Sequence, residues 1–311
     1  MTAKILILDP LTLIGREFLR LDERLGATVS DLQFRHTALE EEHQVAEFGT
    51  GPALVPPLTD PEELDGFDAI VVASDGVSSR HDHLLALLDD QPGTALVDLS
   101  RLACLDDRTQ PSVGGLPTET RQLRVAHPAL VATAAVFEVL ASFGRLHGSL
   151  AAVDPVSAFG REAVELLARQ AGHRIQGAPV DEHIHGHVLA FNQVAADSDE
   201  LQREASLLLP DTPLAVTRCL SGSFHGHIAH LGVGLTQKVE SRDIEEALSQ
   251  AETIAITDLP LSLESVLDSD QVVATAPIVS SDGGQVAITL MADGLRIGGA
   301  LTAIDILESL V

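Results

Sequence analysis

The sequence has few cysteines and no long uncharged apolar stretch. Its only cysteines, Cys104 and Cys219, cannot build a disulfide framework and are typical of a reducing cytoplasm. Although 45% of the residues are hydrophobic, charged residues interrupt the apolar runs before any is long enough to span a bilayer. The first residues enter an apolar strand pattern at once, so we expect no signal peptide. These absences predict a cytoplasmic protein that does not cross a membrane.

Positive charge is also scarce. The chain carries 19 lysines and arginines against 46 aspartates and glutamates, for a net charge of −27, and its only lysines are Lys4 and Lys238. A field of this sign repels nucleic acid and anionic lipid, so we expect neither as a partner. An acidic surface with little lysine suits folding in concentrated salt, where ions screen self-repulsion. The alternative is an acidic protein adapted to ordinary salt.

The first part of the chain alternates between strand and helix patterns. Apolar runs predict strands at 4–9, 67–76, 93–100 and 121–128, and amphipathic patterns predict helices at 14–26, 78–90 and 129–144. Apolar runs rich in β-branched residues that alternate with helices indicate a parallel, doubly wound sheet. We therefore predict a Rossmann-like domain here.

The second part changes character. A strand and a loop are predicted at 148–160, a helix at 161–172 that ends at a glycine, and another helix at 239–252. Long strands of an antiparallel sheet are predicted at 214–222, 226–235, 271–280 and 284–293. The last residues, 293–311, predict a turn and a helix that packs back on the first domain.

These patterns predict an α/β fold in which a Rossmann-like doubly wound N-terminal domain carries an inserted α+β domain and a returning C-terminal helix. The predicted domain boundaries are 1–127 with 291–311 for the Rossmann-like domain and 128–290 for the inserted domain, which would carry dimerisation and substrate binding.

Four strings in this order resemble motifs of the aspartate-semialdehyde dehydrogenase family. They are "SAFGREAVELLARQ", "VLAFNQVAADSDE", "FHGHIAHLGVG" and "DGLRIGGALTAIDILESLV". They are similar, respectively, to the family's Ser-Gly-Ala-Gly loop with its helix, its Ala-Phe-Asn strand end, its Gly-His-Ser segment and its C-terminal Asp-Asn-Leu-Arg segment. The sequence most resembles the Usg-type branch, whose members lack the active-site cysteine. The resemblance implies the family's fold and a homodimer formed through the sheet of the second domain.

The resemblance also implies where the family's reactive groups would lie. The family attacks its aldehyde substrate with a cysteine thiolate at a helix N-terminus. Its Asn-Pro-Asn-Cys string falls on residues 127–130, "HPAL", so Leu130 stands at the nucleophile position. His227 keeps the position of the general acid/base. Leucine has no lone pair with which to attack a carbonyl, so the covalent step is lost.

Two further positions of the family's reaction differ in this chain. Asp154 stands at or near the position of a glutamine that helps to hold the acyl-enzyme. Leu220 stands where the family has an arginine that binds the substrate carboxylate, and Arg218 lies two residues away on the same face of a predicted strand.

The loop after the first strand, "LDPLTLIG", resembles a dinucleotide-binding turn with most of its glycines replaced. Asp9 and Thr12 stand where the family has glycine, and Gly15 is kept. Each Cβ pushes a pyrophosphate away, and the carboxylate of Asp9 repels phosphate unless it is paired. Because the family's nicotinamide lies over the Ser-Gly-Ala-Gly loop, the candidate cofactor-binding residues are Thr12, Gly15, Ser157 and Gly160. We expect no cofactor, with NADP as the alternative because backbone amides can still hold a phosphate.

Neither cysteine is expected to replace the missing nucleophile. Cys219 is predicted to be a buried apolar thiol, and Cys104 an unreactive surface thiol on a loop with nothing nearby to lower its pKa.

Two groups of histidines raise an alternative. His183, His185 and His187 alternate in "EHIHGH", and His225, His227 and His230 lie close together in "FHGHIAH". On strands, alternate side chains share a face and could hold a metal if the two segments were neighbours. No His-Glu-x-x-His pattern accompanies them, and surface loops often carry histidine, so we expect no bound metal.

Together these features predict an aspartate-semialdehyde dehydrogenase homologue that has lost its dehydrogenase activity and acts as a non-catalytic binding or regulatory dimer, a pseudoenzyme. One alternative is an NAD(P)-dependent semialdehyde oxidoreductase that retains activity with His227 as acid/base and no covalent intermediate. A second alternative is a metal-binding protein that uses the histidine groups.

Overall fold

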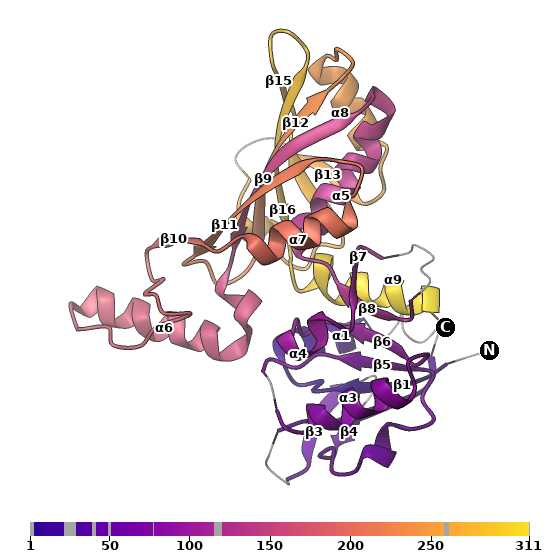
Figure 1. Ribbon diagram of the computed structural model, residues 1–311. Coiled ribbons are helices and arrows are strands. Elements are labelled where there is room, and N and C mark those ends of the chain that lie inside the picture. The colour runs from indigo at the N-terminus through magenta and orange to yellow at the C-terminus, as the bar shows by residue number, and fades with distance from the viewer. Residues whose placement is uncertain are drawn as a thin grey trace. The chain divides into compact units, whose positions relative to one another are not determined.

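The computed structural model describes residues 3–21, 29–38, 42–48, 51–76, 78–114, 120–257 and 261–310. The chain divides into two compact units, one made of Met1–Ala126 with Gly299–Val311 and the other of His127–Gly298 (Figure 1). Residues 291–298, which the sequence-based boundaries place with the first domain, thus lie in the second unit. None of the described helices is long and apolar enough to cross a bilayer.

The first unit is built on a parallel sheet, as predicted. In the part of the chain that the structure describes, the sheet has six strands in the order β2-β1-β5-β6-β8-β7, and every neighbouring pair is parallel. Its strands are β1 (Ala3–Leu8), β2 (Val29–Arg35), β5 (Ala69–Val72), β6 (Ala95–Asp98), β7 (Gln110–Ser112) and β8 (Gln122–Val125). The strand order reverses at β1, which lies between β2 and β5. The carboxyl ends of these three strands therefore form a topological switch point, where open α/β sheets bind ligands.

Helices and a small hairpin complete the first unit. They are α1 (Leu13–Arg20), the hairpin β3 (Gln44–Phe48) and β4 (Gly51–Val55), the 3₁₀ turn η1 (Pro61–Leu64), α3 (His81–Asp90), α4 (Ala103–Asp106) and α9 (Leu301–Leu310). A leucine-rich core fills the space between the sheet, α3, α4 and η1. The helix α9 packs against β6 and β8, which confirms the predicted returning helix.

The first helix, α1, ends earlier than the helix predicted at 14–26. It ends at Arg20, because the N–H of Leu21 bonds the carbonyl of Phe18 in a tight closing turn. Residues 22–26 of the predicted helix lie outside the described residues.

The second unit holds a mixed sheet, not the antiparallel sheet that was predicted. Among its described residues the order is β10-β11-β9-β12-β16-β14-β13, with β15 paired to β16. The strands are β9 (Leu146–Asp154), β10 (Gln193–Ala196), β11 (Leu214–Ser221), β12 (His227–Leu235), β13 (Ile254–Thr257), β14 (Val272–Thr275), β15 (Ile278–Val279) and β16 (Gln285–Ala292). β11 runs parallel to β9, and β13 runs parallel to β14. The chain between β9 and β11 passes through two helices and returns in the same direction, which makes a parallel pair.

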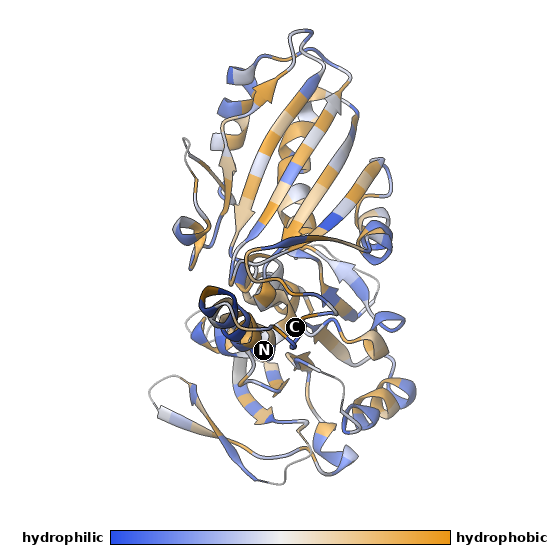
Figure 2. Cartoon of the chain, turned by 90° about the vertical axis from the view of Figure 1, so that its left-hand side faces the viewer, coloured by the Kyte–Doolittle hydropathy of each residue, from blue (hydrophilic) through white to orange (hydrophobic). Residues whose placement is uncertain are grey.

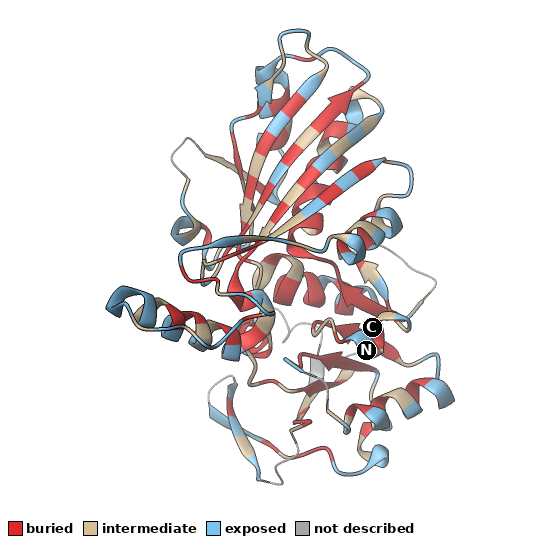
Figure 3. Ribbon diagram, turned by 60° about the vertical axis from the view of Figure 1, so that its left-hand side comes forward, coloured by how far each residue is buried: buried red, intermediate tan, exposed pale blue. Residues whose placement is uncertain are grey.

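The helical elements of this unit are α5 (Pro128–Leu140), η2 (Ala141–Phe143), η3 (Val156–Phe159), α6 (Gly160–Gln176), α7 (Asp199–Leu208), α8 (Ser241–Ser249), η4 (Leu263–Val266) and the π-helical turn η5 (Arg296–Ala300). α5 packs on β9, β12 and β16, while α7 packs on β11. Buried and exposed residues alternate along the long strands (Figure 3), and apolar and polar residues alternate with them (Figure 2). The buried face is the one under α5.

Two local predictions in this unit need correction. The helix predicted to stop at Gly172 continues to Gln176 and ends at Gly177, which adopts a left-handed φ of 68°. Gly172 itself lies inside α6, so it is not the C-terminal cap. The long strand predicted at 271–280 is split into β14 and β15 around Pro277, which has no N–H to donate to a sheet.

Candidate functional site

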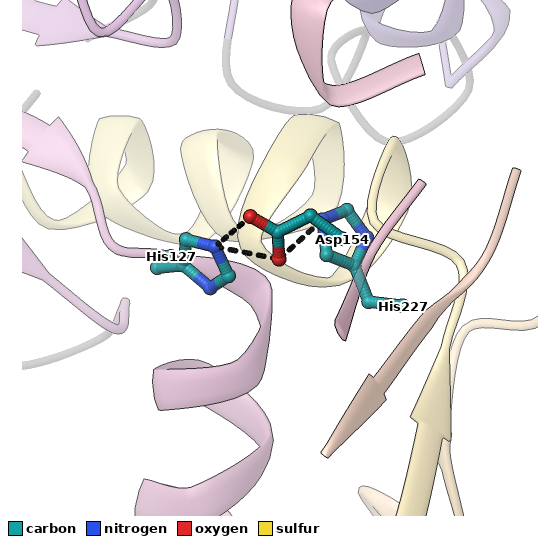
Figure 4. A group of neighbouring side chains, drawn as sticks. All are labelled: His127, Asp154 and His227. Carbon is teal, nitrogen blue, oxygen red and sulfur yellow. Dashed lines mark hydrogen bonds and ion pairs between the residues drawn. The ribbon is translucent and has the colours of Figure 1, made fainter. Parts of the chain in front are cut away.

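The site is a buried group of three side chains from three elements of the second unit. His127 precedes α5, Asp154 is the last residue of β9, and His227 is the first residue of β12 (Figure 4). All three are buried, and one potential ligand atom from each lies within 4.8 Å of the others. The site forms because β9 and β12 are neighbouring antiparallel strands, so the end of one meets the start of the other.

Asp154 is the centre of the group. Its carboxylate has no exposed surface, and its Oδ1 lies 3.1 Å from Nε2 of His127 and 3.9 Å from Nε2 of His227. Its Oδ2 accepts a hydrogen bond of 2.6 Å from Nε of Arg218. Burial alone would raise the pKa of Asp154, but His127 first, then His227 and Arg218, outweigh burial and hold the pKa well below its ordinary value. Asp154 is therefore a permanent carboxylate at neutral pH.

His127 has two roles set by its place before α5. Its Nδ1 accepts a hydrogen bond of 3.2 Å from the N–H of Ala129, so the imidazole caps the helix. Its backbone N–H donates a 2.6 Å hydrogen bond to Oε1 of the buried Glu204 on α7. Because Nδ1 accepts, the ring donates from Nε2, which faces Asp154. The imidazole thus links the helix N-terminus to the carboxylate.

His227 is held against glycine backbone. A Cβ at Gly294 would lie 2.0 Å from Nδ1 of His227 and 3.1 Å from Cγ of Pro128, so only glycine fits there. The His227 ring is 5.5 Å from the ring of His127, in an edge-on arrangement. The residue at the family's acid/base position is therefore packed into the same buried group as Asp154.

The ligand types of this group are those of a 2-His-1-carboxylate metal site. A metal-ligating histidine donates its second ring N–H to an acceptor. In His127 the second nitrogen instead receives an N–H from Ala129, and the guanidinium of Arg218 already neutralises Asp154. The arrangement fits a group of side chains paired around a buried carboxylate better than a metal centre.

The histidine groups noted in the sequence do not converge. In the described part of the chain, the one group with metal-ligand geometry is His127, Asp154 and His227. His183, His185 and His187 are exposed, and His230 points to the exposed face of β12, where its Nδ1 lies 3.1 Å from Oγ1 of Thr289. His225 is half-buried. The two histidine segments, offered by the sequence only as an alternative, form no shared group among the described residues, and His227 and His230 lie on opposite faces of one strand.

Leu130 lies in the first turn of α5 and has no exposed surface. Cys219 lies on β11 next to Arg218, so its side chain projects from the opposite face of the sheet from Asp154. It is partly exposed, which corrects the expectation of a buried thiol. Cys104 lies in α4 of the first unit and packs partly against the leucine core, so it is not a surface loop thiol. Burial first, and nearby carboxylates second, raise the pKa of Cys104.

The candidate cofactor residues of the first unit have structural roles. Thr12 caps α1, where its Oγ1 accepts a 3.1 Å hydrogen bond from the N–H of Gly15. A Cβ at Gly15 would lie 2.7 Å from the carbonyl oxygen of Asp9, so the loop and helix approach each other only through glycine. The Asp9 carboxylate accepts hydrogen bonds from the N–H and Oγ1 of Thr37, each 2.6 Å long, and a third from Oγ of Ser74. The donors of Thr37 and Ser74 are therefore engaged by the chain's own carboxylate.

The other candidate cofactor residues lie in the second unit. Ser157 is buried in η3, and its N–H bonds the carbonyl of Phe224. Gly160 follows η3 with a φ of 84° and begins α6.

Comparisons with known proteins agree with this architecture. An aspartate-semialdehyde dehydrogenase II from Vibrio cholerae, solved in complex with ASA, superposes with a TM-score of 0.85 at 15% identity, covering 100% of this chain and 98% of that one. A probable aspartate-semialdehyde dehydrogenase from Pseudomonas aeruginosa gives a TM-score of 0.81 at 21% identity, covering 99% and 98%. The chain has the aspartate-semialdehyde dehydrogenase fold. The fold class and the family resemblance predicted from sequence are confirmed at this level.

Two further comparisons bear on this fold. An aspartate-semialdehyde dehydrogenase from Candida albicans, solved with NADP, superposes with a TM-score of 0.67 at 13% identity, covering 100% of this chain and 98% of that one. A curated USG-1 protein homolog from Azotobacter vinelandii is 28% identical over 182 residues, which are 53% of this chain and 54% of that protein. The match thus spans about half the length of this relative. No protein-family model matches the chain.

Two members of the group could be recognised from the sequence, but their relationship could not. Asp154 and His227 were singled out by resemblance, whereas His127 was treated only as part of the altered nucleophile string. Glu204 was missed altogether. The available signal was local: a histidine directly before a proline that starts a helix is well placed to cap it.

Proposed function

We propose that this chain is an aspartate-semialdehyde dehydrogenase homologue that does not carry out the dehydrogenase reaction and acts as a non-catalytic binding or regulatory protein. The observation that carries the proposal is Leu130, a fully buried aliphatic side chain where the resemblance places the nucleophile. Without a thiolate there, no acyl-enzyme can form.

Neither thiol offers a substitute. Cys219 is on the wrong face of the sheet, and the pKa of Cys104 is raised rather than lowered, so its thiolate is scarce at neutral pH. A replacement nucleophile would need the opposite change in pKa.

The charged side chains of the site also pair with one another. Arg218 is two residues from the family's substrate-binding position, and its Nε is bonded to Asp154. Turning Arg218 toward a substrate carboxylate would leave the buried carboxylate of Asp154 without its nearest positive charge, which is costly. The pairing of these side chains therefore fits a structural role better than a catalytic one.

Loss of NADP binding is part of the same proposal. The Candida albicans structure was solved with NADP, but in this chain Asp9 places a negative charge in the corresponding loop and uses the surrounding donors. A pyrophosphate approaching this loop meets a like charge.

The test combines binding and turnover on the purified full chain. NADP and NADPH are titrated by calorimetry at low and at high salt, and NADPH formation is followed with aspartate semialdehyde, NADP and inorganic phosphate. We expect no saturable binding and no NADPH. Saturable binding with NADPH production that is abolished in His227→Ala would overturn the proposal and make the chain an oxidoreductase that uses His227 as acid/base.

We also propose that the chain forms a homodimer through the sheet face of the second unit that no helix covers among the described residues. This face carries small or polar side chains at its centre, among them Ala151, Thr217 and Thr289, which allow close approach of a second sheet. Light scattering after size exclusion tests it. Thr217→Arg should yield monomers while Ala168→Arg, on the exposed side of α6, leaves the dimer intact. A monomeric wild-type chain contradicts the proposal.

A further inference from the structure

The side chain of Asp9 lies at the topological switch point of the first unit. Asp9 directly follows β1 and adopts a φ of 59°, in the left-handed region that glycine normally takes. This conformation turns its carboxylate toward Thr37, just after β2, and Ser74, just after β5. The carboxyl ends of three neighbouring strands therefore converge on one carboxylate.

Three donors converge on this carboxylate, and two of them come from Thr37. Its N–H donates to Oδ1 of Asp9 and its hydroxyl donates to Oδ2, each at 2.6 Å. The hydroxyl of Ser74 makes a short hydrogen bond to the same Oδ2. Thr37 and Ser74 are both buried, whereas the side chain of Asp9 remains 12% exposed. Three buried donors therefore contact the carboxylate of Asp9, which itself keeps a small exposed surface.

His81 extends these hydrogen bonds. Its Nδ1 lies 2.9 Å from the backbone nitrogen and 3.2 Å from the carbonyl oxygen of Ser78. Because the hydroxyl of Ser74 donates to Asp9, Nε2 of His81, which lies 2.9 Å from that hydroxyl oxygen, donates to Ser74, as a neutral ring with its proton on Nε2 does. Burial lowers the pKa of His81 and favours this neutral form, although Asp9 opposes the shift.

We propose that Thr37, Ser74 and His81 form an oxyanion-binding site whose occupant is the chain's own Asp9, and that removing this carboxylate opens the site to a free tetrahedral oxyanion such as inorganic phosphate. The inference rests on the proposed absence of nucleotide binding in the wild-type chain. It assigns Asp9 as the residue that determines which anion the switch point holds.

The physical basis is charge and pre-organisation. Hydrogen bonds to an ionised acceptor are stronger than neutral ones, and leaving such donors buried without an acceptor is costly. In Asp9→Gly the backbone keeps its φ without strain, the negative charge is gone, and the hydroxyls of Thr37 and Ser74 lose the carboxylate that accepts from them in wild type. An incoming oxyanion satisfies them and can extend outward through the exposed side.

The experiment measures phosphate binding by the full-length chain. Wild type, Asp9→Gly and Asp9→Asn are titrated with sodium phosphate against sodium chloride of equal ionic strength, with calorimetry and thermal unfolding as readouts. We expect Asp9→Gly to bind phosphate at least about tenfold more tightly than wild type, which corresponds to the gain of about one good hydrogen bond. Asp9→Asn should resemble wild type, because its amide still fills the space.

A triple variant, Asp9→Gly with Thr37→Val and Ser74→Ala, separates site binding from the general stabilisation that phosphate gives proteins. It should lose the gain of Asp9→Gly. If Asp9→Gly is unfolded in chloride, phosphate must restore its circular dichroism spectrum while the triple variant stays unfolded. A folded Asp9→Gly that shows no phosphate gain over wild type, or a triple variant that keeps the gain, overturns the inference. NADP binding by wild type would instead contradict the proposed function, so the two failures are distinguishable.

Discussion

Arg218 donates a 2.6 Å hydrogen bond from Nε to Oδ2 of Asp154, a carboxylate that has no exposed surface, while the arginine side chain is 21% exposed. The pair joins β11 to β9 at the point where the two parallel strands approach the buried histidines. It turns a residue near the family's substrate-binding position into an internal counter-ion.

Removing the arginine should therefore cost much more than a surface charge would. Arg218→Gln leaves a buried carboxylate with a weaker partner, so we expect a loss of about 3 kcal/mol in the free energy of unfolding. Urea denaturation measures it. The double variant Asp154→Asn, Arg218→Gln should lose less unfolding free energy than the sum of the two single variants. The reason is that Asp154→Asn removes the carboxylate charge that Arg218→Gln leaves without its partner. Additive losses would show that the pair is not coupled.

The packing of His227 against Gly294 can be tested by adding one methyl group. Gly294→Ala places Cβ 2.0 Å from the imidazole, so the ring must move, and we expect a destabilisation of about 1–3 kcal/mol. Gly172→Ala is the matched control, because a Cβ there meets nothing within 4 Å inside α6, and it should stabilise by about 0.5–1 kcal/mol. If the two substitutions changed the free energy of unfolding equally, His227 would not be packed against Gly294.

Restoring a thiol at position 130 should not restore a nucleophile. In a Cys104→Ser and Cys219→Ser background, Leu130→Cys places the thiol where the native side chain has no exposed surface, and burial raises its pKa. We expect slow reaction with a disulfide reagent, no NADPH formation, and a stability loss of about 1–2 kcal/mol from the smaller side chain. Rapid labelling of this variant would show that position 130 is open to the reagent. Wild type, in which Cys219 is partly exposed, gives the rate for an accessible thiol.

Asp98 predicts a pH dependence of stability. It is the last residue of β6, and burial raises its pKa to about 6, although the N–H and hydroxyl of Ser100 oppose the shift. Between its ordinary pKa and about 6, the folded chain binds more protons than the unfolded chain, so this group lowers stability as the pH rises through that window. The loss reaches about 3 kcal/mol above it.

Asp98→Asn isolates this contribution. The stability difference between wild type and Asp98→Asn, measured by urea unfolding at a series of pH values, should favour the variant increasingly from about pH 4 to about pH 6 and then level off. A difference that does not change across this window would mean that the carboxyl is not buried in the folded chain.

Several elements were predictable because their signal is local. β1 and β5 are short runs of buried, mostly apolar residues, β6 and β8 are short buried strands that include polar residues, and the helices α3 and α5 have regular apolar spacing. The missed elements are β2, β7, β10, β13, α4, α7 and the β3–β4 hairpin, and most of them mix polar with apolar residues. Their pairing depends on neighbours distant in sequence, which periodicity does not record.

The residues of the candidate site, too, were only partly predictable from the sequence. Resemblance singled out Leu130, Asp154 and His227, but a linear string cannot show that His127 turns its Nε2 toward Asp154 rather than toward solvent. The alternative in which the two histidine segments share a site could not be judged from sequence for a related reason. Strand alternation fixes which side chains share a face, but the faces themselves are known only once the strands are paired.

By itself, the sequence determined the alternation of elements that makes a parallel sheet, the acidic charge, and the chemical identity of the residue at position 130. These are properties of composition and of neighbours along the chain. Only the tertiary structure decided that β9 and β11 run parallel, that Asp154 is enclosed by His127, His227 and Arg218, and that Asp9 is held by Thr37 and Ser74. Each of these depends on strand register and side-chain direction, which bring together residues up to 100 positions apart, such as His127 and His227, and carry no signature at short range.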